Sequence, residues 1–596
     1  MANLLECYQD VTGNAVVKCN DGLIRKFNLA MSTPLDAKAI ESLAATGVSF
    51  SPNVSVFAGS DSASNLTMPI KVNGVVVWQS AESIVKQALS VIDSKPTIPT
   101  TPVFTQPVVS ARSNWVTGVN TVVPFNFAAN PISKNKTVYE PTTGATIKRI
   151  TDVTQDLTGH EVLYNAYSRY PVENITGEYC IAFAGNSTTS LVINRATGSV
   201  VAKLAFDNSG EDGHTIGAAH EVRWHYTPAH PYRVYYVHGT QFWMIDDVRN
   251  QSNTRKMIKD FGVLLDWAGT PNSSRKIYGD QEGNSSLDSD HWAWMAVYYD
   301  GSNFKVRSYL HYQVSTDTLH TMYPKDLSKF SRIPKGEDTL TVFRARPNMI
   351  EMVPDGSGIL IHHGRAFVGS ADAYIGTVFE APYIWPRDFN PSTFTPFRVS
   401  ADATHSGWSS VKGAWYLVQQ DNRRDKFMAV PVSGLNKGYG NEGKLDVTLA
   451  LGAGVIDFHT DGGIYPNVHF GLCTNAADGW TLVSTYTTQT SASHGTGNAL
   501  YMMKITQEAS TIKWHLAPTC NQYPSSNKQD YNESPGSINL AGTRVYTCGD
   551  WNGTLPKARR PADPVNGPYS GPTYVDLFSI DLPTNWGNHF TSNPAP

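Results

Sequence analysis

From about residue 140 to the C-terminus, short apolar runs alternate with turns, and the same theme returns seven times. Each copy has a short apolar strand, a turn, a strand rich in Tyr, Val and Trp, and a further strand that ends in a polar loop. The inner strands or their lead-ins are expected at Val162–Tyr170, His220–His225, Gly283–Met295, Arg346–Val353, His405–Leu417, Asn467–Leu472 and Ser537–Thr547. Their spacing of roughly 50–70 residues exceeds the ~40–50 of compact propeller repeats, so we expect enlarged loops.

Four copies place a glycine in the turn between two strands, namely Gly177, Gly356, Gly479 and Gly542. Glycine suits such turns because it adopts a positive φ without a steric penalty. The residues that follow the first of these turns, Tyr179–Phe183, are apolar, which indicates a strand.

A four-stranded sheet cannot bury its faces alone, whereas sheets stacked radially around an axis do so and leave few open edges. The sequence therefore predicts an all-β fold, a seven-bladed β-propeller over residues 140–596. We expect the ring to close by pairing a strand near Ala145–Ile150 with the last blade. A β-sandwich is the structural alternative, and the repeating period argues against it.

The residues before the propeller suggest a small α+β module over residues 1–93. Pro34–Ala45 suits a short helix, Ile70–Trp78 reads as a hairpin that turns at Asn73-Gly74, and Ser80 is expected to cap a second helix. Residues 94–109 form the predicted linker, since four prolines in this stretch favour an extended, semi-rigid spacer. Residues 110–139 are expected to form a β-rich connecting segment.

Composition narrows the function classes. Only 16% of the residues are charged and 11% are aromatic, which is typical of β-rich surface or virion proteins. A net charge of -4 with scattered Lys and Arg gives no reason to expect nucleic-acid binding. No run reaches the ~18 apolar residues of a membrane helix, so we expect no membrane insertion. The opening residues lack the cationic segment and the long apolar run of an export signal. A phage protein that is released by cell lysis fits both the missing signal and the β-rich composition.

Six cysteines stand at positions 7, 19, 180, 473, 520 and 548, with no C-x-x-C pair, which disfavours a zinc site. Cys7 with Cys19 and Cys520 with Cys548 are two candidate disulfides. We favour buried free thiols for all six.

Several short phrases resemble the TolB-like, oligogalacturonate-lyase-like propellers over roughly residues 150–585. They are Val222–His225, Glu282–Asn284, His291–Met295, Gly536–Val545 and Asp550–Gly553. The resemblance implies a propeller and, for the lyases, a divalent metal bound by histidines and a glutamine in the central channel. The one matching phrase is Asn467-Val468-His469, and Gly536 stands near the place where the last-blade phrase usually carries a histidine.

The layout as a whole resembles a bacteriophage tail fibre, tailspike or similar virion appendage. Such proteins have a small N-terminal anchor, a linker and a large β domain that meets the host surface. This resemblance is one of architecture, and it implies location in the virion, as a tail or capsid appendage.

Histidines supply the most suggestive candidate chemistry. His220, His405 and His469 each stand at or next to the start of an expected inner strand, and these starts ring one mouth of a propeller channel. Three imidazoles there could bind a divalent metal as cofactor. With a carboxylate such as Glu282 or Asp461, His220 and His469 could abstract a proton from a uronic-acid sugar. The alternative is that they line the channel and join blades by hydrogen bonds.

Two polar clusters are further candidates for a metal or acid–base site. They are Asp457, His459 and Asp461, and Asp288, Asp290 and His291. The alternative interpretation is a polar loop for the first cluster and a turn before a strand for the second. The sequence contains no G-x-S-x-G, P-loop or H-E-x-x-H motif.

Aromatic residues expected at the surface are candidates for stacking on sugar rings, chiefly Trp408, Tyr465, Trp480 and Trp551. The alternative is that these rings pack between blades.

The favoured hypothesis is a phage virion protein whose residues 1–93 bind other virion proteins and whose propeller binds a host-surface glycan. We expect a homo-oligomer, because repeated weak contacts produce avidity. The two alternatives are a polysaccharide-degrading enzyme of the uronate-lyase kind and a non-enzymatic capsid or tail decoration protein.

Overall fold

The structure is a computed structural model. It describes residues 4–9, 14–19, 24–28, 55–56, 67–72, 75–80, 132–140, 145–160, 162–165, 167–184, 189–205, 222–250, 255–270, 274–279, 283–302, 304–330, 343–344, 346–363, 381–394, 396–399, 405–421, 426–432, 456–459, 468–485, 499–506, 513–518, 535–549, 575–582 and 586. The chain divides into two compact units, Met1–Phe104 and Thr105–Pro596. The division falls inside the proline-rich segment.

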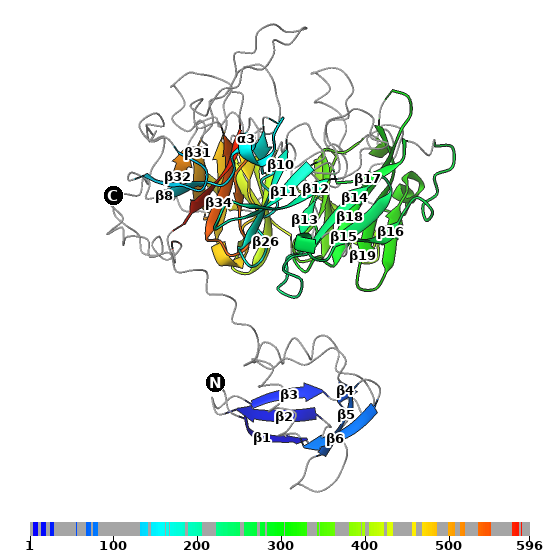
Figure 1. Cartoon of the computed structure of the whole chain (residues 1–596). Helices are drawn as coiled ribbons and strands as arrows, with labels where there is room; N and C mark the ends of the chain where they lie inside the picture. Colours follow the sequence, from blue (N-terminus) through cyan, green and yellow to red (C-terminus); the bar gives the residue numbers. More distant parts are fainter. Residues whose placement is uncertain are drawn as a thin grey trace. The chain divides into compact units, whose positions relative to one another are not determined.

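The first unit contains two three-stranded antiparallel sheets (Figure 1). Their strands are β1 (Leu4–Gln9), β2 (Asn14–Cys19) and β3 (Ile24–Asn28), and β4 (Ser55–Val56), β5 (Thr67–Val72) and β6 (Val75–Ser80). β5 and β6 pair with Val72 opposite Val75, which confirms the hairpin at Asn73-Gly74. The two predicted helices lie outside the described residues.

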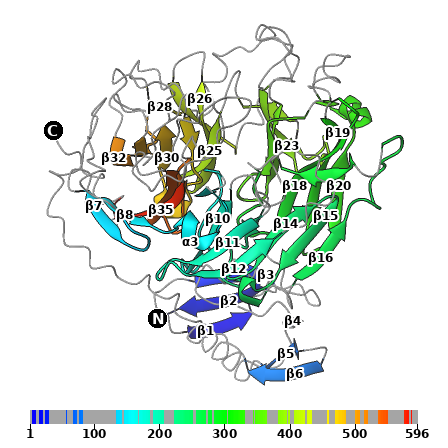
Figure 2. The same ribbon diagram turned by 45° about the horizontal axis from the view of Figure 1, so that its top comes forward.

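The second unit is an all-β, seven-bladed propeller (Figures 1 and 2). Within each of the first six sheets, strands that follow one another in sequence are hydrogen-bonded neighbours. The first three sheets are β9 (Leu163–Tyr164), β10 (Tyr179–Ala184), β11 (Thr189–Asn194) and β12 (Val200–Ala205); β13 (Arg223–Trp224), β14 (Val234–His238), β15 (Gln241–Ile245) and β16 (Arg255–Asp260); and β17 (Lys276–Tyr278), β18 (His291–Tyr299), β19 (Phe304–Gln313) and β20 (Thr318–Met322).

The next three sheets repeat this pattern. They are β21 (Met349–Met352), β22 (Gly358–His363), β23 (Ala381–Pro386) and β24 (Phe397–Arg398); β25 (Ser406–Val411), β26 (Ala414–Asp421), β27 (Lys426–Pro431) and β28 (Ile456–His459); and β29 (Val468–Phe470), β30 (Trp480–Thr485), β31 (Ala499–Lys504) and β32 (Lys513–Pro518). Helical structure among the described residues is short. It includes α3 (Val153–Asp156), residues 343–344, and the 3₁₀ turns Val248–Asn250, Pro324–Lys329 and Asn475–Ala477.

The seventh sheet closes the ring. It combines β33 (Ser537–Ile538), β34 (Arg544–Gly549) and β35 (Asp576–Asp581) with β8 (Ala145–Arg149) and β7 (Thr137–Glu140) from the start of the unit. β35 pairs antiparallel with β8, with Ile580 opposite Ile147, so the predicted closure is confirmed. Because β7 also joins this sheet, the propeller begins a few residues before position 140.

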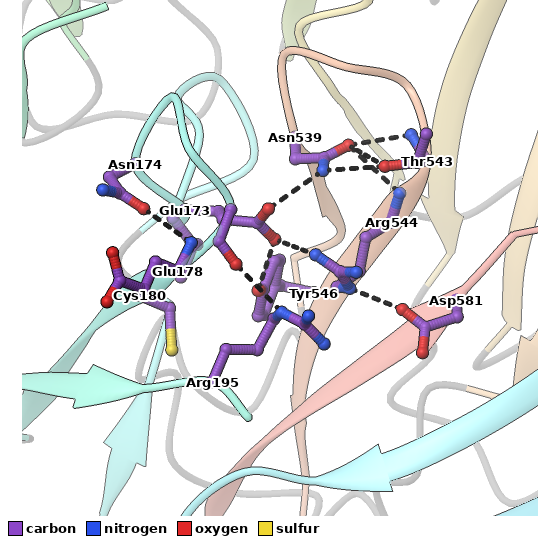
Figure 3. A network of polar contacts seen from close by, with 12 residues as sticks. Glu173, Asn174, Glu178, Cys180, Arg195, Asn539, Thr543, Arg544, Tyr546 and Asp581 are labelled. Atoms are coloured by element: carbon purple, nitrogen blue, oxygen red, sulfur yellow. Dashed lines mark hydrogen bonds and ion pairs between the residues drawn. The ribbon is translucent and has the colours of Figure 1, made fainter. Parts of the chain in front are cut away.

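Buried polar contacts reinforce the closure (Figure 3). Arg544 Nη1 lies 2.6 Å from Glu173 Oε2 of the first blade, and Arg544 Nε donates to Asp581 at 2.5 Å. Tyr546 Oη donates to Glu173 at 2.6 Å, and Asn539 Nδ2 donates to the other oxygen of the same carboxylate. Glu173 is therefore held by three groups of the last blade.

Apolar side chains fill the spaces between blades, so most strands are buried on both faces. Between the first two blades, for example, Ile181 and Phe183 pack in one cluster with Val234, Tyr236 and Ile245. This stacking brings the first strands of the sheets together around one axis.

Six of the seven expected inner strands contain the first strand of a sheet; the third does not. Its first strand, β17, precedes the predicted Gly283–Met295, and that range instead covers an unpaired segment and the start of β18. The Gly283 carbonyl accepts from Arg223 of the second blade, and Met352 N of the fourth blade donates to Asn284 O. This segment thus takes the inner position of the third blade.

Candidate functional site at the propeller axis

Three side chains from one segment cross the axis. Asn165, Tyr167 and Arg169 follow β9, and each makes a side-chain contact with a distant blade. Asn165 Nδ2 donates to the Pro535 carbonyl of the last blade, and Tyr167 Oη lies 2.9 Å from His405 Nδ1 of the fifth. The first blade therefore fills the centre of the ring with polar groups.

Arg169 forms the deepest of these contacts. Its Nη1 donates to Glu351 Oε1 of the fourth blade at 2.6 Å, and its Nη2 donates to Ser406 Oγ of the fifth at 2.7 Å. Trp408 Nε1 donates to the same Glu351 oxygen at 2.7 Å. Both charged side chains are completely buried. Burial raises the pKa of Glu351, and the Arg169 guanidinium opposes that shift.

A second buried guanidinium lies close by. Arg223 stands 3.6 Å over the Tyr170 ring and donates through Nε and Nη2 to the Gly283 carbonyl. Its charge also acts on Glu351, whose pKa it lowers. Among the described residues, the cations Arg169 and Arg223 therefore both act on the Glu351 carboxylate.

Tyr167, His405 and His469 form an aromatic cluster beside Arg169. The centroids of the His405 and His469 rings are 4.6 Å apart, and those of Tyr167 and His469 are 5.0 Å apart. His405, which directly precedes β25, is half-buried, whereas His469 is buried. Burial and then Arg169 lower the pKa of His469 to about 3, so its imidazole is neutral at physiological pH. The half-buried His405 is the member of the cluster that a ligand could reach.

The structure brings together two of the three histidines proposed from the sequence. His405 and His469 meet at the axis, while His220, Glu282, Tyr465 and Trp551 lie outside the described residues. In the part of the chain that the structure describes, no group of three His, Cys, Asp or Glu side chains is placed to bind a metal ion.

Two tryptophans expected at the surface are buried. Trp408 is 1% exposed and donates to Glu351, and Trp480 is 4% exposed and packs edge-on against Trp586 at a centroid distance of 5.2 Å. The expected exposure of both rings is therefore wrong. Each lies in the core between blades, where a sugar cannot stack on it.

Tyr167, Arg169 and Glu351 were not among the predicted site residues. The Met349–Met352 run offered a signal, because Glu351 is a single carboxylate within an apolar strand and needs a buried partner. Its partner lies 182 residues earlier in the chain, and no local pattern identifies it.

Two further sequence predictions concern the cysteines and membrane-spanning helices. Cys180 and Cys473 are buried free thiols, as expected, and burial raises the pKa of each to about 12. Among the described residues, no helix is long and apolar enough to span a membrane.

Comparisons with known proteins extend only to the fold. No protein-family model matches the chain, and no curated protein matches it. An oligogalacturonate lyase structure from Vibrio parahaemolyticus is similar at a TM-score of 0.45 and 11% identity, covering 76% of this chain and 100% of that one. Hydrazine synthase from Kuenenia stuttgartiensis is similar at a TM-score of 0.33 and 12% identity, covering 67% of this chain and 94% of that one.

A PQQ-bound aldose sugar dehydrogenase from Streptomyces coelicolor is similar at a TM-score of 0.30 and 11% identity, covering 74% of this chain and 99% of that one. These proteins differ in chemistry, so the similarity concerns the propeller alone. The seven blades themselves follow from the sheet order.

Proposed function

We propose that this protein is a bacteriophage virion appendage, of the tail-fibre or tailspike kind, that binds a glycan on the host surface. The observation that carries the proposal is the division of the chain into two compact units inside a four-proline segment. Residues 1–93 would attach to other virion proteins, and the propeller would contact the cell. Several copies on one particle would convert weak sugar contacts into avidity.

The axial cluster is the proposed glycan contact. The half-buried His405 provides a ring face and a hydrogen-bonding edge, which suit the apolar face and the hydroxyl groups of a sugar, and the buried Tyr167 holds it through a hydrogen bond to Nδ1. We infer a ligand with negative charge, because Arg169 and Arg223 both act on Glu351 and Arg169 also acts on His469 of the cluster.

Binding of the full-length protein to an array of bacterial surface polysaccharides tests this assignment. His405→Ala is expected to weaken binding tenfold or more. His230→Ala is the matched control, because that histidine is 43% exposed on the second blade, and it should bind like the wild type. Equal binding by wild type and His405→Ala would place the glycan site elsewhere.

The virion location is tested separately. An antibody against the full-length protein should label intact phage particles, and the protein should co-purify with other virion proteins. Labelled particles combined with no glycan binding would favour the alternative of a decoration protein. The absence of the protein from purified particles would refute both.

A second candidate function is polysaccharide degradation of the lyase kind, and the Tyr167–His405–His469 cluster favours it. A tyrosine and two imidazoles in contact could carry a proton from a uronic-acid carbon. A divalent metal bound by His220, His405 and His469 would assist by stabilising negative charge on the sugar. Unsaturated products from an acidic polysaccharide, lost in Tyr167→Phe and on metal chelation, would support this function.

A further inference from the structure

Three histidine rings lie in a row across the third blade, away from the axial cluster. They are His291 of β18, His311 of β19 and His320 of β20. The first two ring centroids are 5.2 Å apart at 24°, and the last two are 5.5 Å apart at 9°. His291 and His311 are buried, at 6% and 1% exposure. His291 also belongs, with Asp288 and Asp290, to one of the two polar clusters identified in the sequence.

An arginine of the fourth blade fixes the protonation of this row. Arg387 Nη1 lies 3.1 Å from His291 Nε2, and an arginine can only donate. His291 Nε2 must therefore accept, which places the proton of His291 on Nδ1. That Nδ1 lies 3.0 Å from His311 Nε2, which must accept in turn. The proton of His311 is thereby assigned to its Nδ1, a buried atom without a hydrogen-bond partner in the described structure.

An added proton conflicts with this arrangement. On His291 it would set an N–H against the N–H of Arg387, with two positive charges in contact. A proton added to His311 Nε2 would face the Nδ1–H of His291. Moving the His291 proton from Nδ1 to Nε2 would avoid this contact but would again set an N–H against the N–H of Arg387. The array can therefore take up a proton only by giving up the bond to Arg387.

A second partner for His291 is already in place. Asp290 Oδ2 lies 3.9 Å from His291 Nε2 and is held by Ser315 and Gln313. The other charged or titratable groups that act on the two buried histidines are Asp288, Arg387 and His320. The two aspartates favour a protonated His291, and Arg387 opposes it.

We propose that His291 is an acid-sensitive switch between the third and fourth blades. Neutral His291 accepts from Arg387 and joins the blades, whereas protonated His291 donates to Asp290 and releases Arg387. This inference is independent of the proposed glycan binding, because the array lies outside the axial cluster.

Release of Arg387 would loosen a specific turn of the fourth blade. Arg387 Nη1 also donates to the Gly356 carbonyl at 3.1 Å. Gly356 has a φ of +73°, and a Cβ there would lie 2.7 Å from His291 Cδ2, so the imidazole packs directly on this turn. A movement of His291 therefore reaches the turn between β21 and β22.

The direction of the pH response follows from the geometry and the environment. Burial and then Arg387 lower the pKa of His291, and burial and then His291 lower that of His311 to about 3. A histidine with a lowered folded pKa leaves the native contact intact near neutral pH and weakens it as the pH falls below about 6.5. Asp288 and Asp290 act in the opposite direction on His291 and favour its protonated form.

Hydrogen exchange followed by mass spectrometry on the full-length protein tests the switch. After correction for intrinsic rates, peptides that cover 354–363 should exchange at least tenfold faster at pH 5 than at pH 7. His291→Gln retains an acceptor for Arg387 but cannot be protonated, so its exchange in these peptides should change less than twofold. His230→Gln is the exposed control and should respond like the wild type.

Two results would overturn the proposal. One is unchanged exchange of residues 354–363 in the wild type at pH 5, and the other is the same acceleration in His291→Gln. If near-UV circular dichroism shows that His291→Gln is not native at pH 7, the Asp290→Asn variant is used to test the switch instead. It removes the carboxylate that receives His291, so the acceleration should move to lower pH, and an unmoved transition would also refute the switch.

Discussion

At the scale of single residues, the axis is defined by a buried ion pair that joins opposite sides of the ring. Arg169 and Glu351 come from the first and fourth blades, and both are inaccessible to water. A pair of this kind has a high desolvation cost, so its presence adds little net stability. Removing one partner is different, because the other charge is then buried without compensation.

Arg169→Met should therefore lower the free energy of unfolding of the propeller by about 3–5 kcal/mol. The double variant Arg169→Met with Glu351→Gln should recover about 1–3 kcal/mol of this loss, because the glutamine is neutral and still accepts from Trp408. Urea unfolding followed by tryptophan fluorescence measures both. A double variant that is less stable than Arg169→Met would contradict the assignment of Glu351 as an ionised partner.

The same residues show where local sequence patterns stop being informative. The gathering of His405 and His469 could be predicted, because each stands at the start of an inner strand and those starts converge. The burial of Trp408 could not, because whether a tryptophan on a strand faces solvent or a neighbouring blade depends on the partner sheet. Here that partner is Glu351, which lies 57 residues away in another blade.

At the scale of elements, turn chemistry and ring closure were both predictable. Gly177, Gly356, Gly479 and Gly542 all have φ between +64° and +78°, as their turns require. β8 pairs with β35 because a ring of sheets needs a strand from one end of the chain to complete the blade at the other. The side chains that stabilise this pairing were not predicted, since Arg149 and Asp576 are 427 residues apart.

The Arg149–Asp576 contact should be essential to closure. Asp576 is completely buried, and one of its oxygens accepts from Arg149 Nε and Nη2, while the other accepts from Thr151 Oγ1 and Val153 N. Asp576→Asn replaces an acceptor by a donor and removes the closer of two carboxylates that pair with Arg149, leaving Asp152 at 3.5 Å. We expect a loss of about 3–5 kcal/mol in the free energy of unfolding, measured by urea titration.

The control is the same substitution in an exposed ion pair. Asp247 and Arg249 lie 2.7 Å apart with side chains 29% and 40% exposed, and Asp247→Asn should cost about 0–1 kcal/mol. Equal losses in the two variants would show that the closing pair contributes no more than a surface contact.

At the scale of the whole molecule, buried neutral histidines set the response to acid. Burial is the main cause that lowers the pKa of His311, His363 and His469 to about 3 each. An unfolded chain protonates the same groups near their ordinary pKa of about 6.5. The unfolded state therefore binds more protons between about pH 6.5 and 3, and stability falls as the pH is lowered through this range.

His363 isolates one such contribution, because aromatic side chains surround it. The Tyr309, Tyr383 and Trp385 rings have centroids 5.7 to 6.2 Å from that of His363. His363→Phe fits these surroundings and removes one titrating group. Between about pH 5.5 and 4, above the folded pKa of about 3, the slope of unfolding free energy against pH should therefore decrease by about 1.4 kcal/mol per pH unit relative to the wild type. His238→Phe, at a half-buried position that ends β14, should leave the slope nearly unchanged. An unchanged slope in His363→Phe would mean that His363 is already protonated in the folded protein.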